Sequence, residues 1–191
     1  RTMTETDSME LDKVGDRPTA LFICTPPTTR AFNFLAALMY TQLFTLLQNK
    51  ANLDYKDQGQ TLPHKVWFIL DEFANIGKIP DLDVQITLIR SAGMFCSIII
   101  QAPSQLEAMY KDITPTIVSN CSILIFLGSN GHADKDSSAA DFISKNLGTK
   151  TIQAENTSIS YSHGEKQISR SYGPNQRPLM TPDEVKRLPD K

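Results

Sequence analysis

Apolar runs of strand length alternate along the chain with segments whose apolar side chains recur at helical spacing. The runs predicted as strands are residues 19–24, 65–70, 94–100 and 121–127. The segments predicted as helices are residues 32–48, 82–91, 104–110, 114–119 and 134–147. A continuous apolar run indicates a strand buried on both faces, whereas apolar residues three and four apart indicate one buried face of a helix. The alternation predicts an α/β fold with a mostly parallel sheet flanked by helices.

The polarity changes after Gly148. Residues 151–176 are rich in Ser, Thr and Gln, and isolated apolar residues alternate with polar ones. This pattern predicts a polar β-hairpin that projects from the domain as an arm. A last helix is expected to follow, because Thr181, Pro182 and two acids form a favourable helix start. We therefore expect residues 1–191 to form a single domain fragment that carries an arm at residues 151–176.

Composition narrows the class of protein only loosely. The chain has 191 residues, of which 40% are hydrophobic and 21% charged, as in ordinary globular domains. Its net charge is -2, so the bulk charge provides no basic surface for nucleic acid. No apolar run has the length of a transmembrane helix. Because the first residue is Arg1 and not Met, we expect a fragment of a longer protein.

The three cysteines, Cys24, Cys96 and Cys121, all lie in apolar stretches. Their odd number and wide spacing argue against a disulfide framework or a zinc site. We expect buried thiols in a reducing compartment.

Two adjacent carboxylates, Asp71 and Glu72, follow directly after the apolar run at residues 65–70. They are expected at the carboxyl end of a parallel strand, the edge of an α/β sheet where ligands bind. An apolar strand that ends in two acids is the pattern of a Walker B element. In that element one carboxylate holds Mg²⁺ through the nucleotide, and the other polarises the attacking water. The alternative is a strand that ends in two solvated acids.

The glycine-rich loop that normally cradles the phosphates of a nucleotide is missing. The sequence contains no GxxxxGKS or GxxxxGKT motif, and the run Gly148-Thr149-Lys150-Thr151 lacks the upstream glycine and follows a predicted helix. The chain therefore carries the carboxylate half of a phosphate site without the cradle. We expect that the chain alone does not bind or hydrolyse ATP usefully.

Longer motifs around these residues resemble the VirD4/TraG/TraD coupling proteins of conjugation and type IV secretion. The motifs are MELDKVGD at residues 9–16 with TALF at 19–22, LDEFANIGKIP at 70–80, IRSAG at 89–93, and RPLMTPDEV at 177–185. A strand that ends in Gln101 also fits the family. The resemblance covers almost the whole chain and corresponds to the C-terminal part of the family's nucleotide-binding domain. It implies a RecA-like P-loop NTPase core whose P-loop part is absent from this chain.

The resemblance also implies roles for individual residues. Asp71 is expected to bind Mg²⁺ through water, and Glu72 to act as the catalytic base. Gln101 is expected to sense the γ-phosphate, and Arg90 to reach the nucleotide of a neighbouring subunit as an arginine finger. The residues alone leave two alternatives open: Arg90 as a capping cation near a helix C-terminus, and Gln101 as a polar strand end.

The function that the resemblance implies is that of a motor ATPase. Members of the family use ATP and Mg²⁺, are anchored at the cytoplasmic face of the membrane and form hexameric rings. They deliver relaxase-bound DNA or protein substrates to secretion-channel components, and DNA is expected to meet the assembled ring. Two other functions stay open: a DNA-translocating ATPase of the FtsK/HerA kind, and a non-catalytic module that docks secretion partners through the arm.

Overall fold

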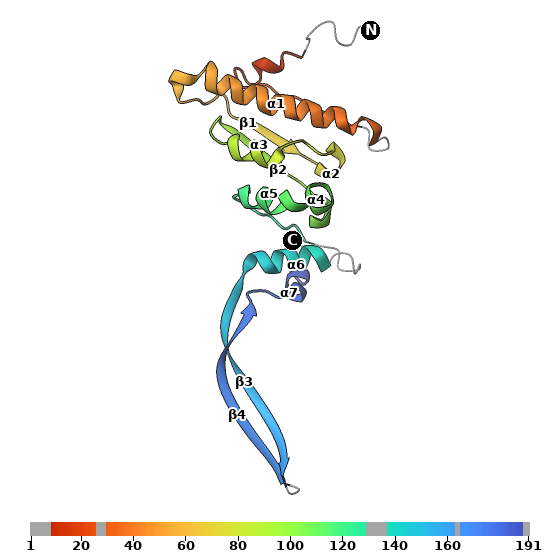
Figure 1. Ribbon diagram of the computed structural model, residues 1–191, viewed down its shortest axis with the longest axis vertical. Coiled ribbons are helices and arrows are strands. Elements are labelled where there is room, and N and C mark those ends of the chain that lie inside the picture. Colours follow the sequence, from red (N-terminus) through yellow and green to blue (C-terminus); the bar gives the residue numbers. More distant parts are fainter. Residues whose placement is uncertain (1–8, 26–29, 129–136, 163–164, 189–191) are drawn as a thin grey trace. The chain divides into compact units, whose positions relative to one another are not determined.

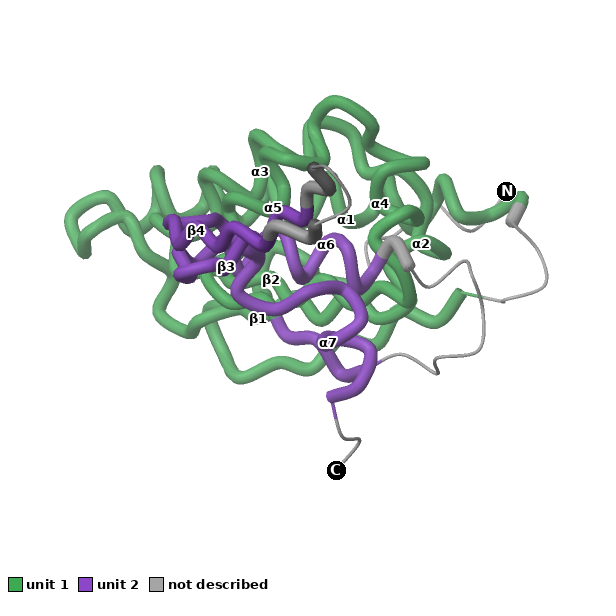
Figure 2. Tube along the Cα trace, turned by 90° about the horizontal axis from the view of Figure 1, so that it is seen from below, with its two compact units in different colours: residues 1–124 green, residues 125–191 purple. Residues whose placement is uncertain are grey.

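The computed structural model describes residues 9–25, 30–128, 137–162 and 165–188 (Figure 1). The chain divides into two compact units, residues 1–124 and residues 125–191 (Figure 2). Each unit contains its own helices and its own pair of hydrogen-bonded strands.

The first unit is built of helices around a short parallel sheet. Its helices are α1 (Asn33–Leu53), α2 (Phe73–Ile76), α3 (Leu82–Leu88), α4 (Pro103–Tyr110) and α5 (Thr114–Asn120). Its strands are β1 (Val66–Leu70) and β2 (Met94–Ile98). Short 3₁₀ turns occupy Leu11–Lys13, Arg30–Phe32, Lys56–Gln58 and Lys111–Ile113. The predicted succession of strands and helices between residues 65 and 119 is therefore confirmed.

The two strands of this sheet pair in parallel, with Val66 opposite Met94 and Leu70 opposite Ile98. Helices α2 and α3 form the connection between them (Figure 1). Because the strands run in the same direction, their carboxyl ends share one edge of the sheet. Residues that follow Leu70 and residues that follow Ile98 are thereby brought together.

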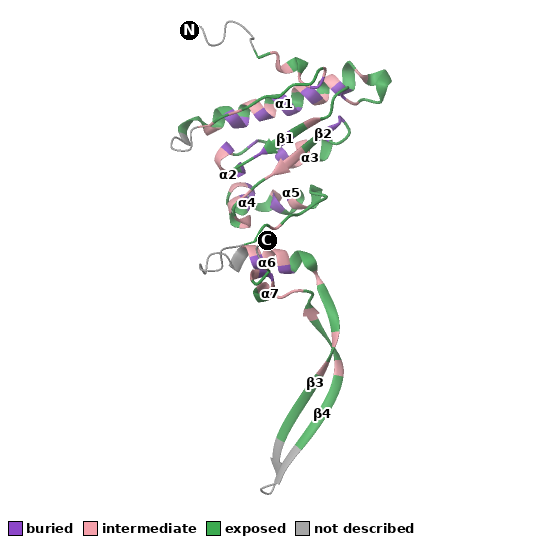
Figure 3. Ribbon diagram, turned by 180° about the vertical axis from the view of Figure 1, so that it is seen from behind, coloured by how far each residue is buried: buried purple, intermediate pink, exposed green. Residues whose placement is uncertain are grey.

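Within the described part of the chain, only one face of β1 is buried. Phe68 and Leu70 point into the core, where the Phe68 ring centroid lies 4.5 Å from that of Phe44 on α1. On the opposite face Trp67 is 68% exposed and Ile69 65% exposed. Figure 3 colours the exposed residues of the chain green. This alternation follows from the two-residue period of a strand. The expectation of a strand buried on both faces is wrong for these residues.

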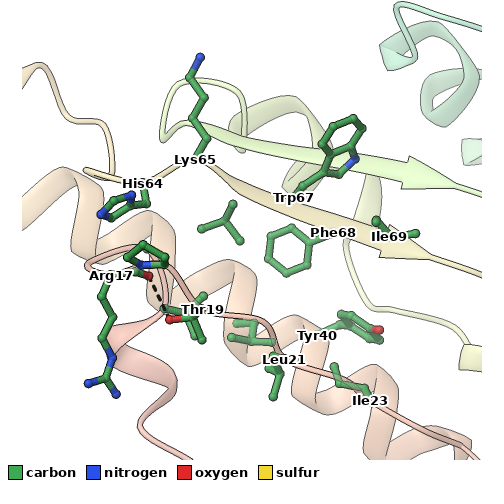
Figure 4. Close-up of a pocket in the computed structure, with 15 residues that line it drawn as sticks. Arg17, Thr19, Leu21, Ile23, Tyr40, His64, Lys65, Trp67, Phe68 and Ile69 are labelled. Carbon is green, nitrogen blue, oxygen red and sulfur yellow. Dashed lines mark hydrogen bonds between the residues drawn. The ribbon is translucent and has the colours of Figure 1, made fainter.

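The predicted strand at residues 19–24 does not form. This segment runs beside β1, but a cleft of about 390 Å³ lies between the two; Thr19, Leu21 and Trp67 are among its lining residues (Figure 4). The two backbones are not joined by the ladder of hydrogen bonds that defines a strand.

The predicted strand at residues 121–127 is also not a strand. No other strand pairs with it among the described residues, and Ile123 is 77% exposed. Its apolar composition suits a buried strand, but a strand forms only where its backbone bonds to the edge of another strand, and no such ladder involves this segment in the described part of the chain.

The expectation of buried thiols is wrong for two of the three cysteines. Cys24 and Cys121 are exposed, because the segments that carry them do not join the sheet. Cys96 on β2 is half-buried, and burial raises the pKa of its thiol to about 12. A thiol with that pKa is a packing group and not a nucleophile at neutral pH.

The second unit combines a hairpin with two helices. Its elements are α6 (Ser137–Leu147), β3 (Thr149–Ser162), β4 (Glu165–Pro178) and α7 (Pro182–Lys186). The strands pair antiparallel from Thr149 opposite Pro178 to Ser162 opposite Glu165. The predicted hairpin is present, with longer strands than its polar pattern indicated. Residues 134–136, which the sequence assigned to the start of α6, lie outside the described residues.

Helix α7 begins as its sequence predicts. The backbone N–H of Glu184 donates to the hydroxyl oxygen of Thr181 at 3.3 Å, and the Glu184 carboxylate accepts from the backbone N–H of Thr181 at 2.8 Å. These reciprocal bonds form a capping box. The backbone N–H of Thr181 and the Arg177 guanidinium hold the pKa of the Glu184 carboxyl below its usual value.

No helix in the described part of the chain combines the length and hydrophobicity that crossing a bilayer requires.

Candidate functional site

The carboxyl ends of β1 and β2 form the edge on which the predicted site residues lie. Two backbone hydrogen bonds extend the pairing beyond the strands: Ile99 N–H donates to the Leu70 carbonyl at 3.1 Å, and Phe73 N–H donates to the Ile99 carbonyl at 3.0 Å. These bonds hold the turn after β1 against the segment after β2. Glu72, in that turn, is thereby brought close to Gln101.

The Glu72 carboxylate is held by two carboxamides. Gln101 Nε2 donates to Glu72 Oε1 at 2.9 Å, and Asn75 Nδ2 donates to Glu72 Oε2 at 3.1 Å. Glu72 and Gln101 are exposed, so the carboxylate stays open to solvent. The sequence pattern predicts Glu72 and Gln101 at the ends of two strands, but it does not single out Asn75. Its position three residues after Glu72, one helical turn on, was the available signal.

The backbone of Glu72 lies in the left-handed region, with φ 49° and ψ 47°. Asp71 Oδ1 accepts a hydrogen bond from the Glu72 N–H at 3.0 Å and stabilises this turn. A residue other than glycine is uncommon in this conformation, and such residues gather at functional sites. The turn directs the Glu72 side chain toward Gln101 and not along the strand.

Gln101 is itself fixed from the start of α4. The side-chain oxygen of Gln105 accepts from the backbone N–H of Gln101 at 3.0 Å and from that of Ala102 at 3.4 Å. Both N–H groups lie at the helix N-terminus, where no intrahelical acceptor exists. Gln105 therefore caps α4 and sets the backbone from which the Gln101 side chain extends.

The chemistry of Asp71 and Glu72 fits Mg²⁺ that is carried by a nucleotide. Carboxylate oxygens are the hard ligands that Mg²⁺ prefers, and Mg²⁺ commonly uses one or two of them together with waters and phosphates. Among the described residues no three His, Cys, Asp or Glu side chains gather as a cage for a metal ion. The exposed carboxylates are suited to share a metal with bound phosphates, not to enclose one alone.

Arg90 lies apart from these residues. It is exposed, in the turn between α3 and β2, and its carbonyl accepts from the Gly93 N–H at 3.2 Å. It therefore precedes β2, whereas Gln101 follows it, so the two lie toward opposite ends of the strand. Within the described part of the chain its guanidinium makes no hydrogen bond or ion pair. The structure thus joins Glu72 to Gln101 and leaves Arg90 outside their site.

The parallel sheet and its flanking helices define an α/β fold of the RecA-like class. The chain superposes on the bacterial conjugative coupling protein TrwBdeltaN70 in complex with sulphate with a TM-score of 0.57 and 21% identity, over 84% of this chain and 32% of that one. The plasmid coupling protein TrwB in complex with the ATP analogue ADPNP gives a TM-score of 0.56 at 21% identity, with the same coverage of 84% and 32%.

Residues 1–191 match the family described as type IV secretory system conjugative DNA transfer, and the chain belongs to this family. It is 29% identical over 180 residues to a conjugal transfer protein TraG of Escherichia coli, covering 91% of this chain and 28% of the relative. It is 30% identical over 178 residues to the protein VirD4 of Agrobacterium fabrum (strain C58 / ATCC 33970), covering 90% of this chain and 24% of the relative. The chain thus spans about a quarter of the length of these relatives.

Proposed function

We propose that this chain supplies the catalytic carboxylate to the ATPase domain of a conjugative coupling protein. The observation that carries the proposal is the Glu72 carboxylate, held between Gln101 and Asn75 at the carboxyl edge of a parallel sheet. Solved structures of TrwB contain ADPNP, or ADP with Mg²⁺. The family match along the whole chain favours a coupling protein over a DNA pump of the FtsK/HerA kind.

In this proposal each site residue acts on a different part of the reaction. Asp71 would hold Mg²⁺ through water, and the bound ion would neutralise charge at the phosphates of ATP. Glu72 accepts a proton from the attacking water through an exposed oxygen. The carboxamide of Gln101 donates a hydrogen bond to Glu72 at the same edge of the sheet and can also contact the γ-phosphate. Arg90 lies away from this edge, a position that suits an arginine finger acting on the site of a neighbouring subunit.

The partners proposed for the full-length protein follow from its family. They are relaxase-bound DNA or secreted proteins as substrates, secretion-channel components, and further copies of the same protein in a hexameric ring. The proposed location is the cytoplasmic face of the membrane.

The test is Glu72→Gln in the full-length protein that contains this chain. The substitution keeps the size of the side chain and removes the base, so we expect ATP turnover to fall by about 10³-fold while nucleotide affinity is retained. Glu107→Gln, an exposed position on α4, is the matched control and is expected to keep turnover. Unchanged turnover with Glu72→Gln would contradict the proposal, and unchanged DNA transfer would favour the non-catalytic docking module.

A further inference from the structure

We infer that Asn75 is a positioning residue for ATP hydrolysis, acting by orienting the carboxylate of Glu72. The inference rests on the proposed function, since it gives Asn75 a role only if Glu72 is the base. Asn75 Nδ2 donates to Glu72 Oε2 at 3.1 Å, on the oxygen that Gln101 does not contact. Each carboxylate oxygen therefore receives one carboxamide N–H.

An exposed glutamate needs such contacts to hold one orientation. Its side chain has several rotatable bonds, and it loses rotamer freedom when it is fixed in one orientation. Glu72 is exposed, so packing does not restrict it. One donor would leave the carboxylate free to rotate about that bond, whereas donors on both oxygens define its plane.

Asn75 is itself a rigid donor. It lies on α2 between Phe73, which is fully buried, and Ile76, which is also buried. The Phe73 ring stacks on Tyr110 with centroids 5.7 Å apart, and the Tyr110 hydroxyl accepts from the Ile79 N–H at 2.9 Å. This packing anchors the short helix in the core. The carboxamide of Asn75 therefore starts from a backbone that the core holds in place.

The chemistry of a carboxamide separates this role from catalysis itself. A carboxamide neither accepts nor releases a proton at neutral pH, so Asn75 is not a base. It also contributes no charge to bind phosphate. Its effect is therefore expected in kcat, through the alignment of Glu72 with the attacking water, and not in the affinity for nucleotide.

The experiment compares Asn75→Asp, Asn75→Ser and the control Asn120→Asp in the full-length ATPase. Asp has the shape of Asn but presents an acceptor to Glu72, and Ser is too short to reach it. We expect both Asn75 variants to lower kcat by about 10²-fold with unchanged KM for ATP and unchanged melting temperature. Asn120 donates within its own helix, from Nδ2 to the Thr116 carbonyl at 2.9 Å, so Asn120→Asp makes the same change of charge away from the site and is expected to keep kcat.

A double-mutant cycle with Glu72→Gln tests whether the loss of kcat in the Asn75 variants arises through Glu72. If Asn75 acts through Glu72, adding Asn75→Ser to Glu72→Gln lowers kcat no further. A further loss of the same size in that background would overturn the inference. So would full turnover in both Asn75 variants. If Glu72→Gln abolishes turnover while the Asn75 variants keep it, only the role of Asn75 is wrong. If Glu72→Gln keeps turnover, both the proposed function and the role of Asn75 are wrong.

Discussion

At the residue scale, Glu72 combines a strained backbone with a side chain held on both oxygens. Its φ of 49° and ψ of 47° place it in the left-handed region, which is unfavourable for a side chain with a Cβ by about 1–2 kcal/mol. The Asp71 carboxylate accepts a hydrogen bond from the Glu72 N–H, and this bond offsets part of the strain. The turn aims the carboxylate at Gln101 and Asn75.

This strain is measurable with Glu72→Gly and Glu72→Ala. Both remove the carboxylate and its two hydrogen bonds, but only glycine adopts the left-handed conformation without steric penalty. We expect Glu72→Gly to be more stable than Glu72→Ala by about 1 kcal/mol in chemical unfolding, with ATP turnover lost in both. Equal free energies of unfolding would show that the turn stores no strain at this position.

At the element scale, the N-terminal segment is attached to α1 through Asp16. Lys50 Nζ donates to Asp16 Oδ2 at 2.5 Å, and the Tyr55 hydroxyl donates to Asp16 Oδ1 at 2.8 Å. Lys50 also donates to the carbonyl of Asp12. The hydrogen bond from Lys50 is the main reason that the pKa of the Asp16 carboxyl lies below its usual value of 3.8.

The lowered pKa makes this attachment dependent on pH. A carboxyl whose pKa is lower in the folded state stabilises the fold above its unfolded-state pKa near 3.8, and this contribution is lost as the pH falls through the lower folded-state value. Because both groups keep some contact with solvent, we expect Asp16→Asn to lower the free energy of unfolding by about 1 kcal/mol at neutral pH.

The difference between wild type and Asp16→Asn is expected to shrink in unfolding curves measured at progressively lower pH, below the unfolded-state pKa. Asp57→Asn, at an exposed position in a 3₁₀ turn, serves as the control and is expected to show no such trend. A difference that stays constant from neutral to acid pH would mean that the ion pair does not stabilise the fold.

At the scale of the whole molecule, the exposed apolar face of the β1–β2 sheet indicates that further elements cover it in the full-length protein. Trp67, Ile69 and Phe95 lie on this face and are exposed. Parallel sheets are normally covered on both faces, and exposed apolar patches mark surfaces that other elements cover. The relatives are several times longer than this chain, which spans 28% and 24% of two of them.

Trp67 reports on that face, because it is the single tryptophan of the chain. In the isolated chain we expect its emission to be that of a solvent-exposed indole, readily quenched by acrylamide. In the full-length protein, the difference spectrum between wild type and Trp67→Phe is expected to shift to shorter wavelength and to resist quenching. A difference spectrum that matches the isolated chain would show that no further element covers this face.

Prediction from the sequence was reliable where the signal is local and repeated. The strands at β1 and β2, the helix α1 and the start of helix α7 at Thr181 and Pro182 follow from apolar periodicity and from short motifs. The shared edge of Glu72 and Gln101 also followed, because two consecutive strands of an α/β pattern are expected to run in parallel. Their contact at 2.9 Å agrees with that expectation.

Prediction failed where formation of an element depends on a distant neighbour. Residues 19–24 and 121–127 have the composition of strands, but a strand exists only if another edge accepts its hydrogen bonds. The contact of Asn75 with Glu72 was missed for a related reason. This contact depends on the left-handed backbone conformation of Glu72. The sequence does not predict that conformation, since glutamate rarely adopts it.

The sequence by itself determined the class of fold and the family, because these depend on the order of residues and on short motifs. It placed two carboxylates after one strand and a glutamine after the next. Tertiary structure alone decided that Asn75 also donates to Glu72, that Arg90 lies outside this site, and that Trp67, Ile69 and Phe95 are exposed on one face of the sheet in the described part of the chain. Each of these depends on which strand edges and faces contact one another in the folded chain. The order of residues along the chain does not specify those contacts.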